Sequence, residues 1–147
     1  KYNCRFVYIS RNDSQKRRVL NEEALMQTIG KYGFQSFKLS NLSFQEKITL
    51  FSNAEIIVAT IGAGQINLVF CKKNTHVIEL MAEDFAQPIF NDLANKVGVK
   101  YDYLICKSGG KAHNFKQGEK LNLIVNIEEV ERKLKRIIAL EKEAITN

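Results

Sequence analysis

Apolar residues occur along this chain in two alternating patterns. Short runs rich in β-branched and aromatic residues, typical of buried strands, are followed by segments whose apolar residues recur at helical spacing. Strands are predicted at residues 5–10, 34–39, 56–60, 76–81 and 99–105, with a short edge strand at 121–125. Helices are predicted from Asn21 to Gly33, from Ser43 onward, at 65–71, from Pro88 to Val97 and from Asn126 onward.

Several helix ends carry capping residues. Two pairs have the spacing of a capping box, Ser43 with Glu46 and Asn126 with Glu129. Asn21 precedes two glutamates and is predicted to cap its helix, while the single proline, Pro88, suits a first helical turn. The last helix, about residues 127–143, is amphipathic and is predicted to pack on the domain; a short coiled coil or a membrane-surface contact remains the alternative.

Strand and helix signals alternate without a hairpin turn. Such an order implies right-handed crossovers and a parallel sheet with helices on both faces. We therefore predict an α/β fold, a Rossmann-like three-layer sandwich with a parallel five-stranded sheet in the order 2-1-3-4-5. In that order the loops after the first and third strands meet at one edge of the sheet, where ligands bind in such folds.

The third strand leads into a glycine-rich turn. Gly62, Ala63 and Gly64 separate the strand at 56–60 from the short helix at 65–71. A strand and turn that open a helix leave backbone N–H groups free to bind an anion, and phosphate is the most common one. Glycines also serve any tight strand-to-helix turn, so the turn alone leaves both interpretations open.

A polar loop follows the first strand and carries several basic residues. The predicted strand order brings Ser10, Arg11, Arg17 and Arg18 to the same crevice as the glycine turn. Arginine binds phosphate oxygens through two parallel hydrogen bonds, so two or three such side chains could hold a diphosphate without a metal. The alternative is a solvated loop before a helix.

Glu79 and Asn67 are two further candidates. Glu79 lies within an apolar strand, where a carboxylate must be paired or hydrogen-bonded; it could accept ribose hydroxyls, pair with a basic side chain or cap a helix. Asn67 could bond a ligand or tie down the glycine turn. His76 and His113 lack partners at metal-ligand spacing, so no metal site is predicted.

Composition narrows the class of protein. The 147 residues suffice for one domain, and 22 Lys and Arg against 16 Asp and Glu give a net charge of +6, which favours anionic partners. Nucleic acid is not expected as a partner, since no nucleic-acid-binding motif is present.

Three widely spaced cysteines indicate a reducing compartment, and no apolar run approaches the roughly 18 residues of a membrane span. We expect a cytoplasmic piece of a longer protein, with peripheral membrane contact left open. The long loop at 106–120 is either functional or disordered.

Several blocks of sequence together resemble the C-terminal domain of glycosyltransferase family 61, which includes bacterial capsular polysaccharide biosynthesis proteins. The matching blocks are residues 8–11, 17–25, 33–34, 42–59, 62–71 and 77–80, in the family's order and spacing. The resemblance covers about the first two thirds of the chain.

The resemblance implies the C-terminal half of a GT-B-type enzyme that transfers a hexose or pentose, with inversion, from a nucleotide sugar to a glycan or polysaccharide acceptor. Its pattern implies that Ser10, Arg11, Arg17 and Arg18 hold the diphosphate. Gly62, Ala63, Gly64 and Asn67 would form the turn beneath it, with Glu79 near the ribose. No cofactor or metal is implied. The N-terminal domain would be missing, so this chain alone is expected to transfer no sugar.

The chain departs from the family pattern at three places. Family members commonly have histidine where this chain has Ile61, Leu-Thr-Asn at 65–67 and Pro-Gly at 73–74. The loss of a polar group at Ile61 supports an alternative function: a non-catalytic scaffold or partner-binding domain that keeps the fold without an active donor site.

Overall fold

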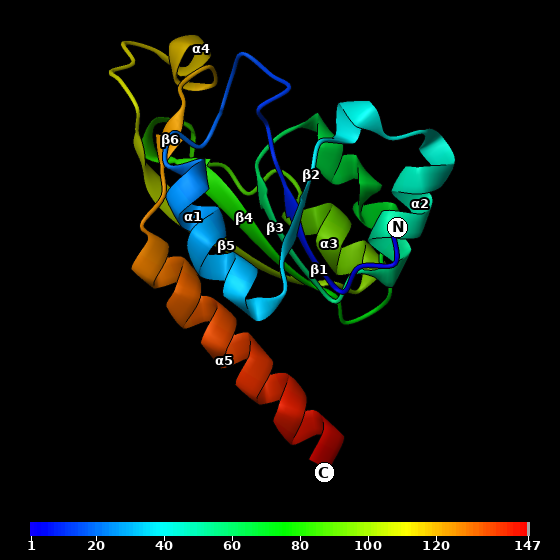
Figure 1. Cartoon of the computed structure of the whole chain (residues 1–147). Coiled ribbons are helices and arrows are strands. Elements are labelled where there is room, and N and C mark those ends of the chain that lie inside the picture. Colours follow the sequence, from blue (N-terminus) through cyan, green and yellow to red (C-terminus); the bar gives the residue numbers. More distant parts are fainter. Residues whose placement is uncertain (147) are drawn as a thin grey trace.

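A six-stranded sheet forms the middle layer of the protein in the computed structural model, which describes residues 1–146 (Figure 1). The strands lie in the order β2-β1-β3-β4-β5-β6. Their bounds are β1 Phe6–Ile9, β2 Gln35–Phe37, β3 Ile56–Thr60, β4 His76–Ala82, β5 Lys100–Ser108 and β6 Leu123–Ile124. Strands β1 to β5 pair in parallel, whereas β6 pairs antiparallel with β5.

The first five strands pair in parallel in the predicted order 2-1-3-4-5, and the edge strand predicted at 121–125 is present as β6. The prediction of a purely parallel, five-stranded sheet is wrong because β6 joins it as a sixth, antiparallel strand. The segment between β5 and β6 makes no crossover over the sheet. It returns on the same edge, and a strand that returns in this way must run antiparallel. Leu123 of β6 also forms a parallel bridge with Val19, which ties the end of the loop after β1 to this edge.

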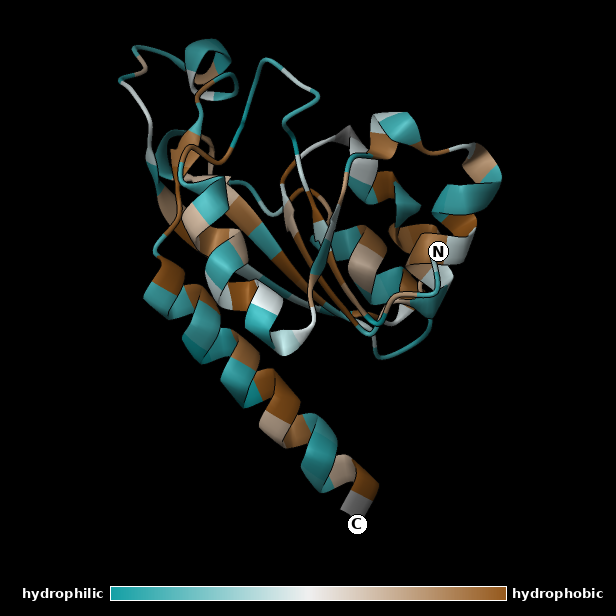
Figure 2. Ribbon diagram, viewed as in Figure 1, coloured by the Kyte–Doolittle hydropathy of each residue, from teal (hydrophilic) through white to brown (hydrophobic). Residues whose placement is uncertain are grey.

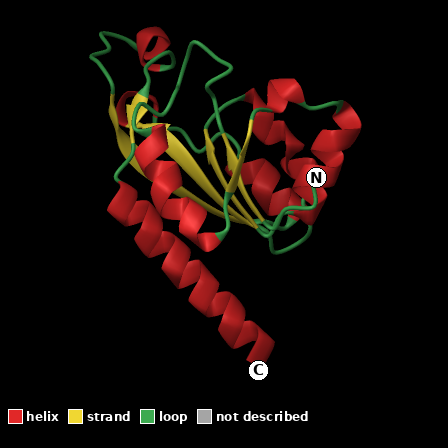
Figure 3. Cartoon of the chain, in the orientation of Figure 1, coloured by secondary structure: helices red, strands yellow, loops and turns green. Residues whose placement is uncertain are grey.

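Helices cover both faces of the sheet, giving three layers (Figure 3). Helices α1 (Glu22–Ile29) and α5 (Ile127–Thr146) share a hydrophobic core with one face. Helices α2 (Phe44–Asn53) and α3 (Asn91–Val97), with the 3₁₀ helix η3 (Ala63–Phe70), pack on the other. The shorter elements are η1 Gly30–Tyr32, η2 Leu39–Asn41, η4 Glu83–Phe85 and α4 Phe115–Gly118.

Alternate residues of each strand supply the two cores. In β3, Ile56 and Val58 face α1 and α5, while Ile57 and Ala59 face α2 and η3. This division follows from the two-residue period of a strand, and it explains why the central strands read as continuous apolar runs. In Figure 2 they appear as brown arrows between helices that expose teal residues. No helix within residues 1–146 combines the length and hydrophobicity needed to cross a membrane.

The predicted helix ends are only partly correct. Ser43 and Glu46 form the reciprocal capping box, and the Glu129 N–H donates to Asn126 Oδ1. Asn21 makes no cap bond, because its side chain donates to and accepts from the backbone of Val125 instead.

The predicted start of one further helix is also wrong. Pro88 precedes α3 instead of standing in its first turn, and its carbonyl accepts from the Asn91 N–H. The short helix predicted after the glycine turn is present, as the 3₁₀ helix η3.

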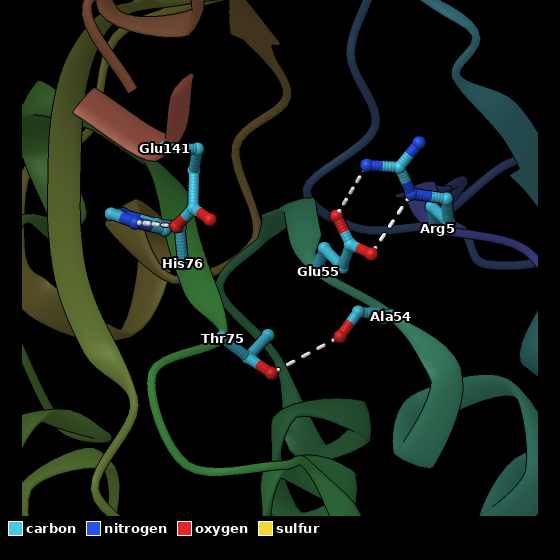
Figure 4. Close-up of polar contacts among 6 residues, drawn as sticks. All are labelled: Arg5, Ala54, Glu55, Thr75, His76 and Glu141. Atoms are coloured by element: carbon cyan, nitrogen blue, oxygen red, sulfur yellow. Dashed lines mark hydrogen bonds and ion pairs between the residues drawn. The ribbon is translucent and has the colours of Figure 1, made fainter. Parts of the chain in front are cut away.

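The amino-terminal edge of the sheet is held by polar contacts (Figure 4). Arg5 forms two hydrogen bonds with Glu55, both of 2.8 Å, and Thr75 Oγ1 donates to the Ala54 carbonyl. A 2.9 Å hydrogen bond joins His76 Nε2 to Glu141 Oε1, so the second half of α5 is attached to the start of β4. This edge is opposite to the one at which the candidate site lies.

Candidate functional site

The loop after β1 and the turn after β3 meet at the carboxyl-terminal edge of the sheet. Strands β1 and β3 pair directly, with Ile9 opposite Ala59, so the residues that follow them emerge side by side. Between them is a hollow of about 120 Å³. Its lining includes Ser10, Arg11 and Asp13 from the arginine loop (residues 10–18) and Thr60, Gly62 and Gly64 around the glycine turn (residues 61–64).

Arg11 lies against the glycine turn. A Cβ atom on Gly62 would collide with the Arg11 guanidinium, and it would stand 3.9 Å from Arg17 Nη2. The backbone of Gly62 is extended, with φ 173°, a conformation open to any residue. Glycine is therefore needed here for space, because only a missing side chain lets the guanidinium approach the backbone this closely.

The arginine loop itself holds Arg11 in place. Arg11 Nη2 donates to Ser14 Oγ at 2.9 Å, and its Nε donates to the Lys16 carbonyl at 3.2 Å. Burial lowers the pKa of Arg11, and the positive charge of Arg17 lowers it further, although Asp13 opposes the effect. The structure thus brings two positive charges together at one turn, an arrangement that a bound anion would stabilise.

Arg17 reaches the same turn from a strained backbone position. Its φ is 54°, in the left-handed region that residues with a side chain seldom adopt. Arg17 Nη1 donates to the Glu119 carbonyl at 3.2 Å, and its guanidinium carbon lies 5.8 Å from the centre of the Phe85 ring.

Two buried polar atoms at this edge have no hydrogen-bond partner among the described residues: Arg17 Nε and Thr60 Oγ1. Thr60 is 4% exposed and lines the hollow. Buried polar groups are nearly always bonded, so the Thr60 hydroxyl is a group that a molecule in the hollow could use. Sequence reasoning missed Thr60, although a hydroxyl residue at the end of a buried strand could have indicated it.

Other predicted site residues lie differently. Arg18 is exposed and is not part of the hollow's lining; its N–H donates to Asn122 Oδ1. Asn67 Nδ2 donates to the Gly64 carbonyl at 2.7 Å, which ties down the glycine turn, one of its two predicted roles. The side chain of Ala63 lies outside the described part of the structure.

Ser10 belongs to a hydrogen-bonding network centred on Glu22. The hydroxyls of Tyr8 and Ser10 and the amide of Asn12 all donate to this carboxylate, at 2.7–3.1 Å. Glu22 thereby fastens the first turn of α1 to the end of β1 and the start of the arginine loop. Sequence reasoning placed Glu22 only in a helical first turn. The signal it missed is that Tyr8 and Ser10, two residues apart on a strand, face the same side.

Glu79 is fully buried on the α2 and η3 side of β4. Its two oxygens accept from Gln65 Nε2 at 2.9 Å and from the Tyr101 hydroxyl at 2.8 Å. Burial raises the pKa of Glu79, and these two hydrogen bonds oppose the rise. Gln65 also lines the hollow, so Glu79 holds a residue of the site while lying outside its lining. A ribose could reach Glu79 only if Gln65 or Tyr101 moved.

The groups at the hollow are mainly hydrogen-bond donors. Within residues 1–146, no three His, Cys, Asp or Glu side chains gather as a metal-binding group. The Arg11 guanidinium, the backbone of the glycine turn and the Thr60 hydroxyl line the hollow together with Asp13, and the Arg17 guanidinium lies beside Gly62, just outside that lining. These groups suit phosphate oxygens, because guanidinium and N–H donors bind them with charge-assisted hydrogen bonds.

Comparisons with known proteins identify the family of this chain. The family model described as Glycosyltransferase 61 matches residues 1–78, which contain both the arginine loop and the glycine turn. The EGF domain-specific O-linked N-acetylglucosamine transferase of Drosophila melanogaster is 32% identical over 101 residues, which is 66% of this chain. The chain spans only 19% of the length of that relative.

Proposed function

This chain belongs to glycosyltransferase family 61, and we propose that it forms the nucleotide-sugar-binding domain of a glycosyltransferase. In this proposal the hollow between the arginine loop and the glycine turn holds the diphosphate of the donor. Arg11 and Arg17 bind its oxygens from one side, while Gly62 and Thr60 contact it from the other.

The approach of Arg11 and Arg17 to Gly62 is the observation that carries the proposal. When the bond between sugar and phosphate breaks, negative charge develops on the departing diphosphate. Guanidinium groups held in place beforehand stabilise that charge without reorganisation in the transition state. The same two charges would replace a metal, so we expect donor binding to persist in the presence of a chelator. We also expect inversion at the sugar carbon.

The small volume of the hollow indicates that more of the protein is needed for activity. At about 120 Å³ the hollow admits a phosphate group. Pockets that hold a whole small molecule or cofactor usually measure about 300–1,000 Å³. We propose that a second domain closes over the donor, as in a GT-B-type enzyme, and supplies the glycan acceptor site and the general base. This chain alone would then bind the donor and transfer no sugar.

The name of the Drosophila relative suggests which donor to test first. That protein is named for transfer of N-acetylglucosamine, so uridine diphosphate N-acetylglucosamine is the first candidate, followed by other uridine and guanosine diphosphate sugars.

The structure weakens the argument for a non-catalytic scaffold. That alternative rested on Ile61, which stands where family members commonly have histidine. Ile61 is buried against Met81 and Phe85 and is not part of the hollow's lining. Replacing a polar side chain at this position therefore removes no group from the hollow in this arrangement.

Isothermal titration calorimetry with these nucleotide sugars tests the proposal. Arg11→Ala and Arg17→Ala should each weaken binding by about ten-fold or more, in keeping with the loss of a charge-assisted hydrogen bond. Arg5→Ala is the matched control, because Arg5 is bound to Glu55 at the opposite edge of the sheet and should leave binding unchanged. Absence of heat at millimolar ligand, or equal effects of all three variants, would reject the proposal.

A further inference from the structure

The connection between β5 and β6, residues 109–122, packs on η4 near the candidate site; we call it the α4 loop. Its helix α4 packs on η4, with the rings of Phe115 and Phe85 5.1 Å apart between centres. Gly118 is buried against the Asp84 carbonyl, with no room for a Cβ atom. The Asn114 side chain accepts from the Gln117 N–H and closes the start of α4.

The α4 loop and η4 each contact Arg17. The Glu119 carbonyl of the α4 loop accepts from Arg17 Nη1 at 3.2 Å. The Phe85 ring of η4, which packs against Phe115 of the α4 loop, lies 5.8 Å from the Arg17 guanidinium carbon. Cations over aromatic faces are attracted by the ring, and this attraction grows as water is excluded.

The two arginines beside Gly62 are therefore held by different parts of the chain. Arg11 is fixed within its own loop, by Ser14 and the Lys16 carbonyl. Arg17 depends on η4 and the α4 loop, which follow the 78 residues matched by the family model. A free arginine side chain loses considerable rotamer entropy when it binds a ligand, so a side chain held beforehand binds more tightly.

We propose that the α4 loop positions Arg17 for diphosphate binding, with Phe115 and Gly118 as positioning residues that act through Phe85 and the Glu119 carbonyl. The inference rests on the proposed function, since it assigns the control of one arginine in that same site. It adds that a segment outside the matched family region determines how tightly the site binds its anion.

Calorimetry with inorganic pyrophosphate tests the inference directly. Phe115→Ala removes the support of the Phe85 ring, and Gly118→Ala forces α4 away from η4. Each should weaken pyrophosphate binding by about five-fold, a typical effect for one lost cation–aromatic contact. Phe115→Tyr, which keeps an aromatic ring at this position, should bind pyrophosphate as tightly as the wild type. Phe44→Ala is the matched control, because Phe44 is 68% exposed, against 55% for Phe115, and it pairs with Phe70 away from the hollow's lining.

A double-mutant cycle separates positioning from a general structural effect. If Phe115 acts through Arg17, then Phe115→Ala should cause no further loss of binding in an Arg17→Ala background. Additive losses, or an unchanged affinity for Phe115→Ala alone, would overturn the inference. Failure of the proposed function looks different, because Arg17→Ala by itself would then leave pyrophosphate binding intact. Phe115 is largely exposed, so its replacement tests the inference even if Gly118→Ala fails to fold.

Discussion

The guanidinium of Arg11 lies over the Cα atom of Gly62, where any side chain on residue 62 would displace it. The two residues follow neighbouring parallel strands, so the sheet determines that they meet. This contact joins the two halves of the candidate site, and the first prediction tests it.

Gly62→Ala should weaken diphosphate binding without unfolding the protein. The added methyl group must push the flexible Arg11 side chain out of the hollow, whereas the extended backbone accepts alanine. We expect roughly ten-fold weaker pyrophosphate binding by calorimetry, about the loss of one charge-assisted hydrogen bond. Gly30→Ala is the control, because nothing lies within 4 Å of its Cβ position. Equal affinity for both variants would show that the contact does not matter for binding.

Glu22→Ala should destabilise the fold and loosen the arginine loop. Three side chains, those of Tyr8, Ser10 and Asn12, lose their acceptor in this variant. We expect a loss of about 2–4 kcal/mol in the free energy of unfolding, measured in urea, since the buried Tyr8 and Ser10 hydroxyls remain unpaired. Glu23→Ala controls for charge at the start of α1, because Glu23 lies in the same first turn and is exposed. A similar loss in the two variants would contradict a specific role for the network.

Tyr101→Phe should destabilise the protein by about 1 kcal/mol, because one oxygen of the buried Glu79 loses its donor. The variant should also raise the pKa of Glu79 further, since that hydrogen bond opposes the effect of burial. Chemical denaturation at neutral pH provides the measurement. Tyr103→Phe is the control, because Tyr103 lies two residues further along β5 and is exposed; this variant should leave the free energy of unfolding unchanged. If both variants matched the wild type, Glu79 would not depend on Tyr101.

His76 should make the protein less stable as the pH falls below its ordinary pKa of 6.5. Burial lowers the pKa of His76 and Lys100 adds to this, while the bond to Glu141 partly opposes it. A histidine whose pKa is lowered by folding favours the neutral form, so the unfolded chain takes up the proton first. Its contribution is therefore present above pH 6.5 and is lost as the pH falls through 6.5 toward the lower value in the folded state.

The difference between the wild type and His76→Gln isolates this group. Glutamine can keep a hydrogen bond to Glu141 without titrating. Thermal unfolding between pH 7.5 and 5 should show a steeper loss of melting temperature for the wild type. Parallel curves for the two proteins would show that His76 does not contribute to the pH dependence.

Local patterns in the sequence predicted most of the elements but not all of their ends. The Ser43–Glu46 capping box is confirmed because a cap forms between residues three positions apart and needs no other part of the chain. Asn21 does stand at the N-cap position of α1, but it makes no side-chain cap bond, since the backbone of Val125 competes for its side chain. Such competition depends on packing between distant segments.

In the candidate site, too, some features follow from local sequence and others from packing between distant segments. The sequence by itself determined the parallel strands, the glycine turn and the basic loop, because strand and helix periods and turn residues act over a few neighbours. Only the tertiary structure decided that Arg11 and Arg17 reach Gly62 while Arg18 stays exposed, and that Gln65 and Tyr101 occupy the oxygens of Glu79. These contacts join segments brought together by sheet order and side-chain packing, and no local spacing along the chain encodes them.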